Sequence, residues 1–69
     1  MPLVSVPKGR CLSIKKIDGN DEIKRFLNHL GFIEGAAVTV VSESAGNMIL
    51  KIKESRVGIE KNLVKKIYV

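Results

Sequence analysis

The clearest feature of the hydrophobic pattern is an alternation of apolar and polar residues between positions 48 and 54. Met48, Leu50 and Ile52 would share one face of a strand, because successive side chains point to opposite faces. Where the alternation changes phase near Lys16, we expect a β-bulge or a strand end. Other short segments rich in β-branched residues occur at 3–6, 11–17, 37–43, 57–59 and 66–69. The pattern therefore predicts several short strands.

One segment has the spacing of an amphipathic helix instead. Between about Asp21 and Leu30, apolar residues recur at three- and four-residue intervals, which form a single stripe. The residues of this predicted core-facing stripe are Ile23, Phe26, Leu27 and Leu30. Asn20 precedes the segment as a good N-cap, and Gly31 follows it as a residue able to adopt a left-handed conformation. A second, short helical turn is predicted over residues 61–64.

The length and composition fit one small, mostly-β domain over residues 1–69. Apolar residues make up 45% of the chain and charged residues 28%, a balance typical of folded domains. Aromatic residues are only 4%, so the core must consist mainly of Ile, Leu and Val. Closure would remove exposed sheet edges, and we therefore expect a small closed barrel.

The single cysteine and the glycines indicate a cytoplasmic protein with several tight turns. Cys11 has no partner within the chain for a disulfide, and we expect it to be a small buried hydrophobe. We expect Gly9, Gly31 and Gly35 to provide backbone angles that other residues resist. The first residues lack the pattern of a signal peptide, and no apolar run is long enough to cross a bilayer.

The segment around the end of the predicted helix resembles the FeoA family. Leu30-Gly31-Phe32, followed by Gly35, matches that family's Leu-Gly-Leu and its nearby turn glycine, and 67–69 resembles its closing strand. Glu34 stands where the family often has proline. The resemblance extends over essentially the whole chain. It implies an SH3-like β-barrel of five to six short strands with one inserted α-helix, at about Asp21 to Leu30.

The same resemblance implies a function in bacterial iron homeostasis. A FeoA-like protein would be a cytoplasmic accessory or regulatory protein of ferrous iron transport. Its partner would be the cytosolic part of a FeoB-type, GTP-dependent membrane transporter. Such a partner would recruit it to the inner face of the membrane through protein-protein interaction.

No catalytic, cofactor-binding or metal-binding constellation is found in the sequence. His29 is the only histidine, so one chain cannot supply the two-histidine, one-carboxylate ligands of a ferrous site, and we expect it at the surface. There is neither a phosphate-binding loop nor an arranged nucleophile and base. We therefore expect neither an enzyme nor a small-molecule substrate.

The basic charge keeps a second class of function open. The formal net charge is +5 and the pI is about 9.7, which suits an acidic protein surface or a nucleic acid. A small nucleic-acid-binding or transcription-regulatory module is the alternative. It is disfavoured because Phe26 is predicted in the core, which leaves only Tyr68 free to stack on bases. Self-association through a sheet edge is a third hypothesis, and a solvated basic surface with no ligand is the fourth.

Large apolar residues directly after the helix suggest where a partner would bind. Phe32 and Ile33 either fold back onto the barrel or contribute to a contact patch. The predicted contact surface consists of Lys24, Arg25, Leu30, Phe32 and Ile33.

Overall fold

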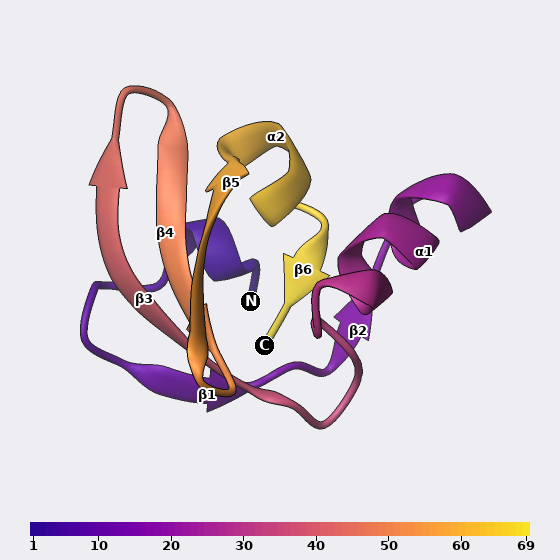
Figure 1. The fold of residues 1–69 in the computed structure, drawn as a ribbon, viewed down its shortest axis with the longest axis horizontal. Helices are drawn as coiled ribbons and strands as arrows, with labels where there is room; N and C mark the ends of the chain where they lie inside the picture. Colours follow the sequence, from indigo (N-terminus) through magenta and orange to yellow (C-terminus); the bar gives the residue numbers. More distant parts are fainter.

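Two antiparallel sheets form the framework, as Figure 1 shows in the computed structural model, which describes residues 1–69. The larger sheet has the order β1-β3-β4-β5, with strands β1 (Cys11–Ser13), β3 (Ala37–Ser44), β4 (Asn47–Ile52) and β5 (Ser55–Glu60). The smaller sheet pairs β2 (Lys16–Ile17) with β6 (Ile67–Tyr68). The mostly-β prediction is confirmed.

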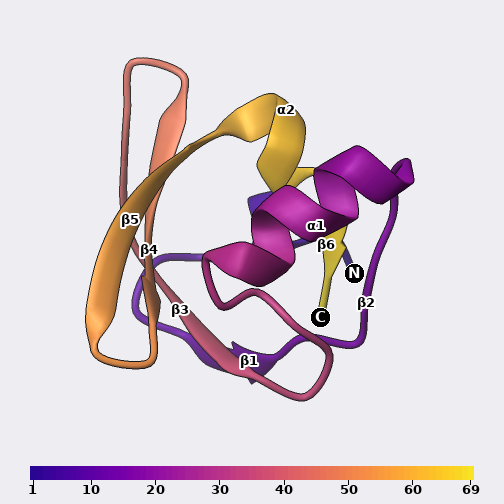
Figure 2. The same cartoon turned by 45° about the vertical axis from the view of Figure 1, so that its right-hand side comes forward.

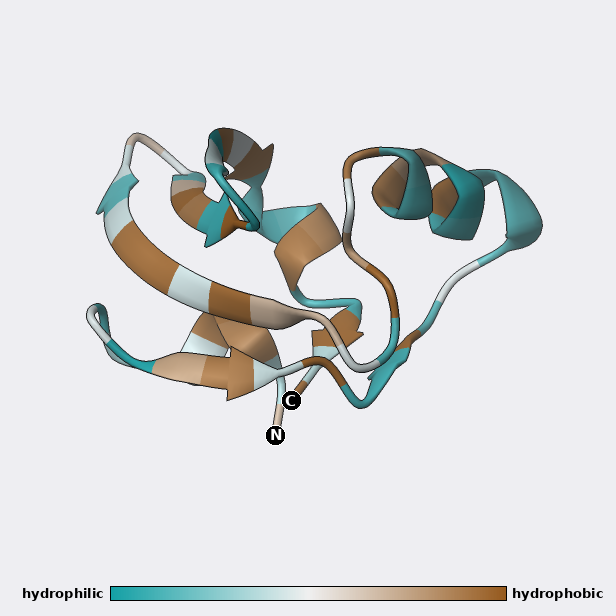
Figure 3. Ribbon diagram, turned by 60° about the horizontal axis from the view of Figure 1, so that its bottom comes forward, coloured by the Kyte–Doolittle hydropathy of each residue, from teal (hydrophilic) through white to brown (hydrophobic).

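The alternating pattern correctly located the central strand. Met48, Leu50 and Ile52 of β4 are each 1% exposed or less, while Lys51 between them is exposed. Neighbouring strand β3 alternates in the same way, and Figure 3 shows its brown apolar bands separated by pale polar ones. The buried faces of both strands form one side of the core.

The predicted strand over residues 11–17 is divided between the two sheets. The Ile14 N–H donates to the Ala36 carbonyl (2.9 Å), whereas the Lys15 N–H donates to the Tyr68 carbonyl (2.7 Å). The chain therefore leaves one sheet and joins the other within two residues. This transfer explains the phase change that the sequence shows near Lys16.

Helix α1 (Asp21–His29) ends one residue earlier than predicted, and its ends are formed as expected. The Asn20 side-chain oxygen accepts a hydrogen bond from the Ile23 N–H at 2.9 Å, which satisfies a free donor of the first turn. Gly31 follows the helix with φ +106°, a conformation that favours glycine. The short helix α2 (Lys61–Val64) also lies where it was predicted.

Two expectations about the fold are wrong. Residues Leu3–Ser5 form a 3-10 helix, η1, rather than a strand, because the Val6 N–H bonds back to the Leu3 carbonyl at 3.0 Å. This turn brings Leu3 and Val6 onto one side, and both are buried. The expectation of a closed barrel is also wrong, because β1 and β5 do not pair with each other and remain the two edges of the larger sheet.

The core is entirely apolar. It contains 14 buried residues and no buried polar side chain. Phe32 is the largest side chain that is fully buried.

The two ends of the chain lie side by side (Figure 1), and the Val69 N–H donates to the Met1 carbonyl at 2.9 Å. None of the helices is both long and apolar enough to span a membrane.

The placement of Phe26 on the core face is also a wrong expectation. Phe26 is 50% exposed, whereas the adjacent Leu27 is fully buried. Consecutive helical residues point about 100° apart, so Phe26 and Leu27 lie at opposite margins of the four-residue stripe. Only the Leu27 side of the stripe is fully buried, while Ile23 and Leu30, which lie between the two margins, are half-buried.

The two phenylalanines should respond very differently to truncation. Phe32→Ala should lower the free energy of unfolding by about 3–5 kcal/mol, because it leaves a cavity in a thin core. Phe26→Ala is the matched control and should cost less than about 1 kcal/mol, since half of its surface is already in water. Urea unfolding followed by circular dichroism measures both. Equal losses would contradict this assignment of core and surface.

The turn between β3 and β4 should be open to stabilisation. Ala45 and Gly46 both have positive φ, +50° and +82°, as in the type I′ turns that prefer Asn-Gly. Ala45→Asn should raise the free energy of unfolding by about 0.5–1 kcal/mol, because asparagine tolerates this conformation better than alanine. Ala45→Val should lower it, and the urea midpoints of both variants check the prediction. Equal stability of the two variants would contradict a left-handed conformation at position 45.

Candidate partner-binding surface beside helix α1

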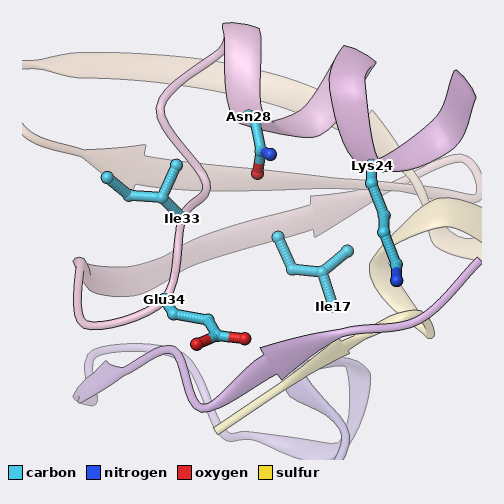
Figure 4. Close-up of a pocket in the computed structure, with 5 residues that line it drawn as sticks. All are labelled: Ile17, Lys24, Asn28, Ile33 and Glu34. Carbon is cyan, nitrogen blue, oxygen red and sulfur yellow. The ribbon is translucent and has the colours of Figure 1, made fainter. Parts of the chain in front are cut away.

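A shallow pocket lies between strand β2, helix α1 and the segment after the helix (Figure 4). Its volume is about 210 Å³, and the side chains that line it are Ile17, Lys24, Asn28, Ile33 and Glu34. Three separate parts of the chain therefore meet at one place on the surface.

The reversal of the chain after α1 builds one wall of this pocket. The N–H of Gly31 donates to the Asn28 carbonyl and that of Phe32 to the Leu27 carbonyl, each at 3.0 Å. These bonds turn the chain back so that Phe32 enters the core and Ile33 emerges beside the helix. The Gly35 N–H then donates to the Ile14 carbonyl at 2.8 Å, which ties the loop to the first strands.

The pocket combines apolar walls with two opposite charges. Ile33 is 44% exposed and Ile17 is half-buried, so both offer apolar surface to a ligand. Lys24 and Glu34 are exposed, and neither belongs to either of the two salt bridges of the structure. A protein segment with an apolar side chain and flanking polar groups would match this surface.

The predicted contact residues do not form one patch. Lys24 and Ile33 meet at the pocket, while Arg25 is exposed one position further around the helix. Leu30 is half-buried at the C-cap. Phe32 is fully buried and cannot touch a partner directly, because the turn at Gly31 directs it inward.

Sequence reasoning missed three pocket residues. Asn28 follows Lys24 by four positions, so helical spacing could have placed both on one face. Glu34 adjoins Ile33 in the chain. Ile17 reaches the site only through tertiary structure, and no local signal could have indicated it.

The remaining candidate side chains lie elsewhere. Cys11 is exposed, contrary to expectation, because the alternation in β1 turns Leu12 inward and Cys11 outward. His29 is exposed at the helix end, as predicted, and no three His, Cys, Asp or Glu side chains form a metal-binding group. Tyr68 is half-buried, with the Lys16 Nζ 5.0 Å from its ring centre, so Phe26 is the more accessible aromatic residue.

Comparison with solved structures confirms the SH3-like fold. An iron uptake regulatory protein, FeoA, is 27% identical with a TM-score of 0.87, over 96% of this chain and 88% of that one. The FeoA of Stenotrophomonas maltophilia in complex with zinc is 23% identical with a TM-score of 0.87, over 100% and 88% of the two chains. That protein is described as an SH3 domain protein and a candidate activating factor for ferrous iron transport.

A similar fold also occurs within larger regulators. A manganese-dependent transcriptional repressor has a TM-score of 0.91 and 17% identity, over 100% of this chain but only 40% of the repressor. The comparison with curated proteins gave no match. The model of the FeoA domain family matches residues 1–69, and the chain therefore belongs to the FeoA domain family.

Proposed function

We propose that this chain is a non-catalytic accessory protein of ferrous iron uptake that binds the cytosolic part of a FeoB-type transporter. The observation that carries the proposal is the match to the FeoA domain over residues 1–69. The similarity to a protein described as an iron uptake regulator, at 27% identity, supports the same role. The whole chain would act as one domain at the inner face of the membrane.

The proposed contact surface comprises the pocket beside α1 and the exposed side of the helix that carries Lys24 and Arg25. Ile33 would supply the apolar contact, and Lys24 and Arg25 would face acidic groups on the transporter. Leu30 supports this surface from its half-buried position, and Phe32 supports it from the core. A small apolar centre with charges at its rim is typical of protein-protein contact surfaces.

Substitution of the pocket residues should weaken binding without unfolding the protein. Ile33→Asp and Lys24→Glu should each raise the dissociation constant for the cytosolic GTP-binding domain of a FeoB-type transporter at least about tenfold. Both side chains are exposed, so the free energy of unfolding should change by less than about 1 kcal/mol. Isothermal titration calorimetry at moderate salt, with urea unfolding alongside, measures the two effects.

Two matched controls separate this surface from nonspecific effects of charge and hydrophobicity. Phe26→Asp alters an exposed apolar residue at the opposite margin of the helix stripe, and Lys65→Glu alters an exposed lysine after α2. Neither should change the affinity beyond about twofold. Equal losses in all four variants would exclude the pocket as the contact surface. If the unmodified protein does not bind but shifts DNA or RNA at low salt, the nucleic-acid alternative replaces this proposal.

A further inference from the structure

Strand β5 presents an unpaired edge. It pairs with β4 through six consecutive residue pairs without a bulge, and its other side has no strand neighbour. Figure 2 shows β5 at the outer margin of the sheet, away from α1. The opposite edge, β1, has only three residues, whereas β5 has six and contains neither proline nor lysine. Short length, proline and lysine usually protect edge strands from pairing with another chain, and β5 has none of the three. It is therefore the more open of the two edges.

The hydrogen-bond pattern shows which backbone groups of β5 face outward. The Lys61 N–H donates to the Gly46 carbonyl at 3.0 Å, just beyond the last β4–β5 pair. In an antiparallel ladder, residues that hydrogen-bond to the neighbouring strand alternate with residues that do not. The backbone N–H and C=O groups of Val57 and Ile59 therefore bond to β4, whereas those of Arg56 and Gly58 point to the unpaired side. The Glu60 N–H points outward too, while its carbonyl, at the N-cap of α2, belongs to the helix.

Gly58 leaves the centre of this edge without a side chain of its own. It is exposed and has no side chain, and a Cβ built there would lie 3.3 Å from the Ile49 Cδ1. The Ile49 side chain of β4 therefore lies over Gly58 on this face, and Gly58 itself puts no side chain between its backbone and a strand that approaches in the plane of the sheet.

The charges on either side of Gly58 are opposite in sign and equally spaced. Arg56 and Glu60 lie two residues before and two after it, on the same exposed face. Arg56 forms no salt bridge, and the Glu60 carboxylate accepts only an exposed hydrogen bond from the Asn62 side chain at 3.3 Å. An antiparallel strand of the same sequence, centred on Gly58, would place arginine opposite glutamate at both positions.

We propose that β5 pairs with β5 of a second copy of this chain, in antiparallel register about Gly58, to form a symmetric dimer. The two Gly58 residues exchange hydrogen bonds across the two-fold axis, and each Glu60 N–H donates to the Arg56 carbonyl of the second copy. Each Arg56 side chain pairs with Glu60 of the second copy on the exposed face. On the other face, the half-buried Val57 lies opposite Ile59 of the second copy. An isologous interface needs such self-complementarity.

The dimer surface contains none of the residues that line the pocket beside α1. Dimer formation and transporter binding can therefore be measured and lost separately. The interface is small, so we expect a weak dimer that forms at high protein concentration and dissociates as salt screens the charge pairs.

A charge-swap series tests the proposal. Sedimentation velocity at low salt should show the mass of the unmodified chain rising with concentration from 7.6 kDa towards twice that value. Arg56→Glu and Glu60→Arg should each raise the dimer dissociation constant at least about tenfold, because each replaces two attractions with two repulsions. The double variant should restore the dimer. Circular dichroism confirms that each variant is folded, and equal behaviour of all four proteins would overturn the proposal.

Disulfide trapping tests the register independently. In a Cys11→Ser background, Gly58→Cys places two thiols at the two-fold axis, where bonded strand pairs have Cα atoms about 5.5 Å apart, within disulfide range. Ser55→Cys is the matched control, because its copies would lie about 20 Å apart in this register. Mild oxidation should give a covalent dimer of the Gly58 variant alone. Equal trapping of both variants, or trapping of neither, would exclude this register.

Discussion

Burial of Phe32 behind the end of helix α1 is the contact on which the rest of the structure depends. The chain is too short for a second apolar layer, so its core consists of 14 residues with no polar group among them. Phe32 is the largest fully buried side chain of this core. It can enter the core because Gly31 adopts a positive φ and turns the chain inward directly after the helix. The same turn exposes Ile33, so packing of the core and construction of the pocket have one cause.

The sequence predicted the parts of the fold in which local preference and tertiary packing agree. Strand β4 alternates between buried residues and more exposed ones in phase with the core, and α1 has a capping asparagine and a terminating glycine. The errors occur where tertiary structure decides. Leu3 and Val6 are buried by a 3-10 turn that the β-branched Val4 between them does not favour, and Phe26 is exposed because only one side of α1 reaches the core.

Prediction of the candidate site was less complete, for a physical reason. Lys24 and Ile33 could be proposed from their closeness to the helix end, but β2 contributes Ile17 from the other side of the pocket. That contact exists because the chain passes from one sheet to the other after Ile14. The phase change near Lys16 indicated an interruption of the strand there, but not which elements the next residues would pack against. The open edge of β5 was likewise hidden by the expectation of a closed barrel. Whether an edge is covered depends on strand order, which short strands of similar composition do not encode locally.

The open edge and the pocket have a joint consequence for partner binding. A dimer joined at β5 would present two copies of the surface beside α1, because the two-fold axis passes through Gly58 and not through the pocket. A partner with two matching sites, or two partners held close together in a membrane, would then bind the dimer more tightly than the monomer, by raising the effective concentration of the second site. By linkage, the same partner would stabilise a dimer too weak to persist alone. In this arrangement a thin domain without a deep cleft gains affinity from the number of its contacts rather than from the depth of any one.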